Sequence, residues 1–264
     1  MAEARTAPFL RRIALVRDGE IDWNAFPFSV PAIRALRAIE VRSRVLCFVG
    51  ENGSGKSTLL EAIALACGFG HEGGTRNFRF STQDRPAESP EAPVERLADA
   101  LRMSWTKRQR DGFFLRAESF YNVATYLDRL ERETTMGPSP LQSYGGISLH
   151  ARSHGESFFT LFLERFAGKG IYLLDEPEAA LSAARQLALM VRMHDLLASD
   201  AETQFVIATH SPILLGFPGT QIVSFDGGRV AEIAYRETDA YLLTRRFLDN
   251  PDRMLSELFG ADRD

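Results

Sequence analysis

Short apolar runs alternate with segments of helical period along most of the chain. Residues 44–49 form an apolar run, a glycine-rich stretch follows, and apolar residues then recur with helical spacing over 59–66. Two further apolar runs, 171–174 and 205–208, each follow a segment of helical period, at 157–166 and 183–197. Strands that alternate with helices predict an α/β fold, in which a mostly parallel sheet is covered on both faces.

Three regions depart from this alternation. Residues 8–42 mix Pro and aromatic residues with alternating polar and apolar positions, which predicts an antiparallel edge sheet. Residues 84–140 are rich in Pro, Glu and Arg and predict a helical subdomain around 94–103 and 120–132. Residues 223–233 carry Asp-Gly-Gly between apolar flanks, which is typical of a β-hairpin. We therefore expect a single domain over 1–264, within which about 84–160 form the helical subdomain.

Composition narrows the class of protein. The 264 residues are 45% hydrophobic and 25% charged, with a formal net charge of −4, as in folded proteins with a large core. No apolar run approaches the roughly 18 residues of a membrane span, and the N-terminal segment lacks the apolar stretch of a secretory signal. Cys47 and Cys67 lie among apolar residues, which indicates reduced core thiols. We expect a cytoplasmic protein with no direct membrane insertion.

The strongest chemical signal follows the first apolar run. Residues 50–58 read G-E-N-G-S-G-K-S-T and fit the phosphate-binding pattern G-x-x-x-x-G-K-[ST]. Glycines let successive N–H groups point at phosphate oxygens, and the next helix presents its positive end to the same anion. A plain glycine-rich turn is the alternative, but the strand and helix that the motif requires flank it. The predicted nucleotide-binding residues are Gly50, Glu51, Asn52, Gly53, Ser54, Gly55, Lys56, Ser57 and Thr58.

The ends of the three apolar runs supply the rest of a nucleotide site. Lys56 is expected to neutralise the β and γ phosphates, and the Ser57 hydroxyl to ligate Mg²⁺. The second run ends in Asp175, which can hold Mg²⁺ through water, and Glu176, which can act as general base. His210 follows the third run and is placed to hydrogen-bond the γ-phosphate. An exposed loop start at Asp-Glu and a structural histidine are the simpler alternatives.

These motifs resemble the ATP-binding cassette (ABC) ATPase superfamily, and within it the small soluble ATPases that lack membrane domains. The resemblance covers residues 26 to about 225. S-H-G-E-S at 153–157 is similar to the family signature L-S-G-G-Q, with Ser153, Gly155 and Glu156 in matching positions and His154 in place of the first Gly. The resemblance implies that this helix N-terminus grips a γ-phosphate. Ser-x-x-Glu before an apolar run is also a capping box.

The resemblance implies a P-loop NTPase fold: a mostly parallel core sheet, an N-terminal antiparallel β edge sheet and a helical subdomain that carries the signature. It implies a Q-loop residue that touches Mg²⁺ or the attacking water, for which Glu118 is favoured and Gln83 competes. It also implies an aromatic residue that stacks on adenine, with Phe28 as the first candidate and Phe26 as the second; plain core is the alternative. Ser182 stands where the family's D-loop usually has Asp.

The function expected from the resemblance is an ATPase that uses ATP and Mg²⁺ and switches between an open state and an ATP-dependent homodimer. A transporter nucleotide-binding subunit is one alternative, which the unusual signature disfavours, and a further protein partner is left open. DNA repair or defence is another, based on Trp105 within a basic cluster that could bind nucleic acid or simply be solvated. That cluster comprises Arg102, Lys107, Arg108 and Arg110. A small-molecule kinase would need an arginine-rich lid and no signature.

Overall fold

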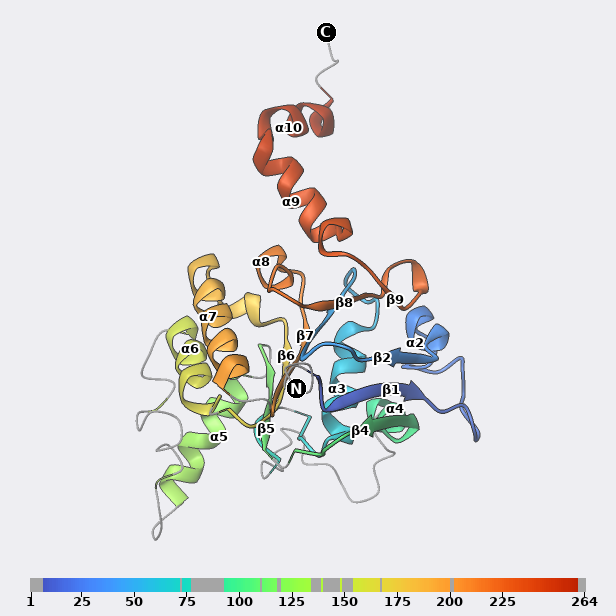
Figure 1. Ribbon diagram of the computed structural model, residues 1–264, viewed down its shortest axis with the longest axis vertical. Coiled ribbons are helices and arrows are strands. Elements are labelled where there is room, and N and C mark those ends of the chain that lie inside the picture. Colours follow the sequence, from blue (N-terminus) through green and yellow to red (C-terminus); the bar gives the residue numbers. More distant parts are fainter. Residues whose placement is uncertain are drawn as a thin grey trace.

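Within the residues that the structure describes, a six-stranded sheet forms the centre of the molecule, in the order β5-β6-β7-β3-β8-β9 (Figure 1). The structure is a computed structural model that describes residues 7–71, 73–76, 93–109, 111–117, 120–133, 139, 148, 154–166, 168–199 and 202–260. Five strands run parallel: β5 (Gly112–Arg116), β6 (Gly170–Asp175), β7 (Thr203–Ala208), β3 (Val45–Val49) and β8 (Gln221–Ser224). The expected mostly parallel sheet is confirmed.

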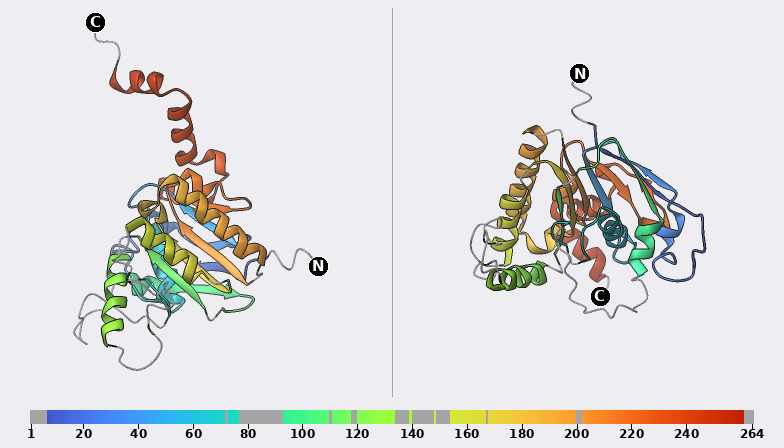
Figure 2. Two further views of the ribbon diagram at one scale, coloured as in Figure 1. Left: turned by 90° about the vertical axis from the view of Figure 1, so that its left-hand side faces the viewer. Right: turned by 90° about the horizontal axis from the view of Figure 1, so that it is seen from below.

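Each central strand buries alternate side chains on opposite faces of this sheet. In β3, Leu46 and Phe48 join one apolar cluster, whereas Val45, Cys47 and Val49 join the other. Helices α3 (Lys56–Ala66) and α4 (Pro93–Ala100) cover the first face, and α6 (His154–Arg165) and α7 (Ala183–Ser199) cover the second (Figure 2). Because both faces are buried, the strands read as continuous apolar runs rather than alternating ones. Both cysteines are free and buried, as expected.

A three-stranded antiparallel sheet lies against the first face, in the order β2-β1-β4. Strands β1 (Leu10–Leu15) and β2 (Ala38–Glu40), with the short helix α2 (Pro31–Ala35), come from the region expected to form an edge sheet. The third strand, β4 (Leu101–Trp105), corrects the prediction of a helix over 94–103. Helix α4 ends at Ala100, and the next five residues alternate between half-buried and exposed positions as they pair with β1.

The stretch 84–160 is therefore mixed rather than wholly helical in its described parts. Strand β5 extends the main sheet, while α5 (Phe120–Glu133) and α6 supply helices near the second face. Strands β8 and β9 (Ala231–Glu232) form the expected antiparallel hairpin around a short 3₁₀ turn, η4 (Asp226–Gly228). Among the described helices, none combines the length and apolar character needed to cross a bilayer.

The chain ends in two helices that project from the body of the molecule (Figure 1). After the 3₁₀ turn η5 (Tyr235–Glu237), α9 (Asp239–Asp249) starts at Thr238, whose side chain accepts a hydrogen bond from the Tyr241 N–H. Helix α10 (Pro251–Phe259) starts at Asn250 in the same way, with Pro at its first position. Side-chain caps and an N-terminal Pro stabilise helix starts, so local sequence sets both helices and the bend between them.

Candidate nucleotide-binding site

The phosphate loop connects the end of β3 to the start of α3 in the form that its glycines allow. Gly50, Gly53 and Gly55 have φ angles of 150°, 80° and 102°, which side-chain-bearing residues rarely adopt. A Cβ on Gly50 would lie 2.9 Å from the Ser54 hydroxyl, and one on Gly55 would lie 3.0 Å from a Val30 methyl carbon. The loop is therefore wrapped closely on itself and on its neighbours, and it opens onto the N-terminus of α3, where an anion is favoured.

Lys56 is held inside this loop. Its residue is only 3% exposed, and its Nζ donates a hydrogen bond to the Glu51 carbonyl oxygen at 3.1 Å, across the loop. Burial lowers the pKa of Lys56, and the nearby carboxylates of Glu176 and Asp175 oppose that shift. A buried ammonium whose Nζ donates to a neutral carbonyl oxygen is suited to receive the negative charge of a polyphosphate.

Asp175, the carboxylate expected to bind Mg²⁺, lines the same cavity as Ser57. Asp175 ends β6 and shares a cavity of about 210 Å³ with Ser57, Arg116 and Glu176. A hydroxyl and a carboxylate are oxygen donors of the kind that Mg²⁺ prefers, so Ser57 and Asp175 fit that ion together. The structure thus brings the two predicted ligands from separate elements to one cavity.

An arginine that the sequence analysis did not single out lines the same cavity. Strands β5 and β6 pair in register, so Arg116 stands directly opposite Asp175 at the strand ends. The Arg116 Nε lies 3.6 Å from the Asp175 Oδ2, and the guanidinium also lies 3.2 Å from the Glu61 Oε2 on α3. Sequence alone could not have found this pair, because it depends on the neighbour order of two strands far apart in the chain.

Behind Arg116, a polar chain continues away from the site. The second Glu61 oxygen lies 3.0 Å from the His71 Nδ1, and the His71 Nε2 lies 2.7 Å from Glu95 on α4. The hydrogen bonds to Glu61 and Glu95 raise the pKa of His71 against the opposing effect of burial. With a carboxylate at each ring nitrogen, the imidazolium form can donate to both. This chain links the candidate metal site to the loop after α3.

Glu176 has an unusual backbone. With φ 48° and ψ 51°, it has the only positive φ of any non-glycine residue in the described part of the chain, and its N–H donates to the Ala208 carbonyl oxygen at 2.9 Å. Such a conformation costs about 1–3 kcal/mol and is retained where the surroundings impose it, often at functional sites. It sets the carboxylate at the edge of the cavity, 3.7 Å from the His210 Nε2. The two predicted catalytic residues therefore meet.

Glu178 is a supporting residue that the sequence analysis did not assign to the site. One of its oxygens accepts the His210 N–H at 2.5 Å, so the turn after β6 holds the loop after β7. The other oxygen is buried without a protein partner. Its position two residues after Glu176, across a proline that stiffens the turn, was the only available signal.

Asp226 is a second supporting residue, at the turn of the β8–β9 hairpin. Its Oδ1 accepts the Glu51 N–H at 2.8 Å, and its Oδ2 accepts the Ser224 hydroxyl at 2.8 Å. The hairpin was predicted, but its contact with the phosphate loop was not, because nothing in the hairpin sequence indicates which loop it faces. The carboxylate fixes the first turn of the phosphate loop from outside.

The two candidate aromatics for adenine differ in accessibility. Phe28 is 5% exposed and packs edge-on against Trp23, with ring centroids 5.8 Å apart, whereas Phe26 is 52% exposed. Both precede Val30, which would contact a side chain at Gly55, so this segment lies beside the phosphate loop. The geometry favours Phe26 over Phe28, because only Phe26 has an open ring surface to offer a base.

The signature and Q-loop predictions fall at the edge of the described residues. Ser153, Glu118 and Gln83 lie outside them. Helix α6 begins at His154, so Gly155 and Glu156 are in its first turn, and the expected helix N-terminus after Ser153 is present. In the D-loop segment, the Ser182 hydroxyl accepts the Arg185 N–H at 3.4 Å, at the start of α7. The roles of these residues remain predictions.

The basic cluster proposed for nucleic acid is largely engaged within the chain. Trp105 stacks on Phe9, with ring centroids 6.1 Å apart and planes at 17°. Lys107 pairs with Glu202, and Arg108 donates to the Ala66 carbonyl oxygen at 3.2 Å. Arg102 is exposed, and Arg110 lies outside the described residues. A stacked tryptophan and a paired lysine offer little to a nucleic acid.

A family model matches the part of the chain that holds the phosphate loop. Residues 28–102, which hold the phosphate loop and α3, match a family model described as an AAA domain. The match covers the phosphate loop and agrees with the resemblance drawn from the motifs, and the mostly parallel sheet of the structure is the fold which that resemblance implies. No curated protein matches the chain.

Two solved structures resemble the chain at low identity. One is described as a metal-chelate-type ABC transporter in an inward-facing conformation, with 16% identity and a TM-score of 0.44, over 78% of this chain and 79% of that one. The other is described as a cobalt transport ATP-binding protein, with 16% identity and a TM-score of 0.37, over 87% of this chain and 80% of that one. At such values, what those proteins transport does not carry over to this chain.

Proposed function

We propose that this chain binds MgATP and hydrolyses it at the interface of an ATP-dependent homodimer, and so acts as a nucleotide switch. The observation that carries the proposal is the meeting of Ser57, Asp175 and Glu176 at one cavity, directly after the buried Lys56. A hydroxyl, a metal-binding carboxylate, a base and a cation are the groups that hydrolysis of a terminal phosphate requires.

Each of these groups has one task. The loop N–H groups and Lys56 hold the β and γ phosphates, while Ser57 and Asp175 hold Mg²⁺. Bound Mg²⁺ would neutralise negative charge on the phosphates. Glu176 accepts a proton from the attacking water, and His210, 3.7 Å away, donates a hydrogen bond to the γ-phosphate and helps to orient that carboxylate. Phe26 stacks on the base, and Phe28 supports the segment from the core.

Support for a dimer comes from the exposure of the hydrolytic end of the site. The Glu176 and His210 side chains are 36% and 39% exposed, although both border the candidate site of reaction. Hydrolytic sites generally exclude bulk water when they act, and a second copy would cover this edge. In the family that the motifs resemble, Ser153 and the first turn of α6 would supply that cover from the partner.

Glu176→Gln tests the proposal, because it keeps the shape and hydrogen-bonding size of the side chain but removes the base. We expect ATP affinity to stay within about threefold and turnover to fall at least about a hundredfold, the scale of a lost general base. The trapped dimer should be seen by light scattering with MgATP and disappear without nucleotide. Glu202→Gln, on the far side of the sheet from the site, is the matched control and should behave like the unaltered chain. Normal turnover in Glu176→Gln, or a monomer with MgATP, would overturn the proposal.

A further inference from the structure

The C-terminal helices α9 and α10 form an arm, residues 239–259, that carries most of the exposed large apolar side chains in the described chain. Six of these residues are between 41% and 80% exposed: Leu242, Leu243, Phe247, Leu248, Leu258 and Phe259. No residue of either helix is buried. Figure 2 shows the arm standing clear of both sheets. Apolar side chains gathered on one projecting element mark a protein contact more often than a plain surface.

Five of the arm's charged side chains, by contrast, pair with one another within it. Arg245 pairs with Asp249 at 3.3 Å and Arg253 with Glu257 at 3.0 Å, each one helical turn apart. Arg246 of α9 also pairs with Glu257, which ties α9 to α10 across their bend. These pairs brace the arm and leave little unbalanced charge. A partner for the arm is therefore recognised through apolar contact rather than through a nucleic acid's phosphates or an acidic peptide.

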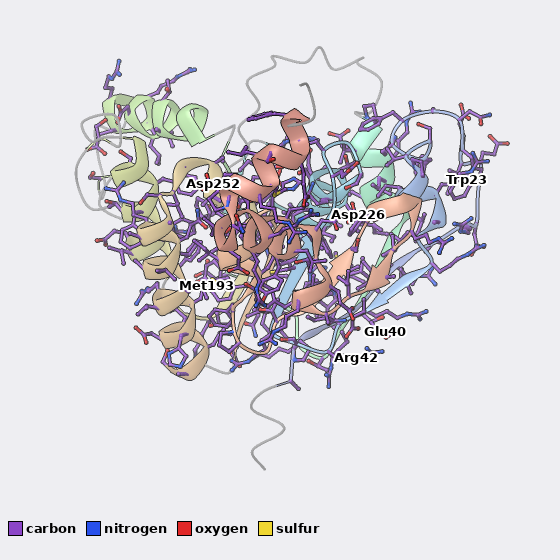
Figure 3. All side chains as sticks on the ribbon, turned by 90° about the horizontal axis from the view of Figure 1, so that it is seen from above. Trp23, Glu40, Arg42, Met193, Asp226 and Asp252 are labelled. Carbon is purple, nitrogen blue, oxygen red and sulfur yellow. The ribbon has the colours of Figure 1, made fainter. Side chains whose placement is uncertain are left out.

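The base of the arm borders the nucleotide site. A cavity of about 310 Å³ is shared by Asp239 and Leu243 of α9 with Gly50 of the phosphate loop, His210 and Asp226. Seen from above, the arm stands over the middle of the molecule, with Asp226 beside it (Figure 3). The arm thus rises from the face onto which the phosphate loop and His210 open. In the proposed dimer, that face meets the second copy.

We infer that the arm clasps a second copy of this chain and supplies much of the dimer's contact area; this inference rests on the proposed function. In a two-fold dimer each arm crosses to the other copy, so the same apolar contact is formed twice, once by each arm. The two arms matter because a specific interface buries about 1,200–2,000 Å² in total, an area that two partly exposed side chains, Glu176 and His210, cannot supply. Since the arm starts beside Glu51 and His210, nucleotide at the phosphate loop and the partner at the arm share one surface.

The test places the double variant Leu248→Glu, Phe259→Glu in the full-length Glu176→Gln chain, in which the ATP-bound dimer should persist. Both positions are highly exposed, so the fold should stand, and circular dichroism checks that it does. By sedimentation equilibrium with MgATP, we expect the dimer's dissociation constant to rise at least tenfold, while calorimetry shows ATP affinity unchanged within about twofold. Leu187→Glu, Val191→Glu on α7 places the same two charges on exposed apolar positions outside the arm and should dimerise normally. Leu248→Met, Phe259→Leu should also dimerise normally.

The outcomes separate the arm from the proposed function. Unchanged dimerisation of the acidic arm variant, or equal weakening by the α7 control, would overturn the arm's role. A Glu176→Gln chain that binds ATP but stays monomeric without the arm changes would overturn the proposed dimer and the arm's role together. Failure of the unaltered chain to bind or hydrolyse ATP would overturn the proposed function instead, and a nucleotide-free dimer that still needs the arm would support the arm alone.

Crosslinking gives a second, direct measurement. Both natural cysteines are buried, and burial raises the pKa of each thiol, so a cysteine introduced at Leu258 can be labelled selectively with a photoreactive group. Illumination with MgATP should yield a product of twice the chain mass, and mass spectrometry of mixed light and isotope-labelled chains should find links between copies. Links within one copy only would contradict the inference.

Discussion

The phosphate loop and the Glu176–His210 edge lie at one end of the same sheet, yet they are built differently. Lys56 is almost wholly buried, bonded to the loop, and surrounded by backbone that only glycine can adopt. Glu176 and His210 are more than a third exposed, and 3.7 Å separates them. The proposed phosphate-binding half is therefore enclosed by the chain itself, whereas the proposed hydrolytic half is open to solvent.

The largest effect is expected when the buried cation of the phosphate loop is removed. Lys56→Ala should abolish nucleotide binding, because it deletes a fixed positive charge from a cradle that must hold several negative charges. Calorimetry with ATP measures the effect. Lys107→Ala, which removes an exposed lysine two residues after β4, is the control. Undiminished ATP affinity in Lys56→Ala would mean that the phosphate loop is not the nucleotide site.

The next largest effect is expected when the two parts of one nucleotide site are supplied by two different variant chains. Ser153→Arg should leave ATP binding by the monomer nearly intact but block dimerisation and turnover, because a bulky cation would fill the space for the partner's nucleotide. Mixing it with Lys56→Ala leaves one composite site with an intact lysine and an intact serine. We expect turnover to reappear on mixing two inactive proteins, in an enzyme-coupled phosphate assay. Full activity of Ser153→Arg alone would reduce S-H-G-E-S to a helix cap.

A smaller loss of ATP affinity is expected when Asp226, which holds the phosphate loop from outside, is replaced. Asp226→Ala removes the oxygen that accepts the Glu51 N–H, a charge-assisted hydrogen bond worth about 1.5 kcal/mol, and should weaken ATP binding by roughly tenfold. Asp226→Asn keeps an acceptor oxygen and should lose less. Titration calorimetry compares the two. Equal losses would mean that the charge of Asp226, and not the hydrogen bond, matters to the loop.

The smallest effect concerns His71, behind the site. Because its pKa is raised in the folded protein, its stabilising pairs with Glu61 and Glu95 are fully present below the unfolded value of about 6.5 and are lost as pH rises through the folded value. Urea unfolding should therefore show His71→Gln to cost up to about 1 kcal/mol at pH 6 and progressively less at higher pH. A cost that does not vary with pH would indicate packing rather than charge.

Much of the fold could be predicted because short local sequence patterns identify the central strands and α3. Apolar runs of strand length, a glycine loop and helical period identify β3, α3, β6 and β7 without reference to one another. The failure at 101–105 has a physical cause: Leu101, Met103 and Trp105 alternate like a strand, but that pattern gains its meaning only from β1, which lies about ninety residues earlier. Helical period in α4 extended the predicted helix one element too far.

The site divides in the same way. Motif residues were found because their chemistry and spacing are local, whereas Arg116, Glu178 and Asp226 act through contacts between distant elements. Arg116 meets Asp175 only because β5 and β6 are neighbours in register. Asp226 reaches Glu51 across 175 positions of sequence. The structure adds that Phe28 is buried and Phe26 is exposed, a difference that one sequence cannot show for two nearby phenylalanines.

The register of β5 and β6 also bears on the order in which ligands arrive. Because Arg116 stands opposite Asp175, the carboxylate that we propose as a ligand of Mg²⁺ already has the Arg116 Nε within 3.6 Å. A free cation would have to compete with that charge, whereas a cation that arrives with polyphosphate brings anionic oxygens that Arg116 can take in exchange. The Arg116–Asp175 pair therefore favours binding of metal and nucleotide together as one complex, and metal alone should bind weakly.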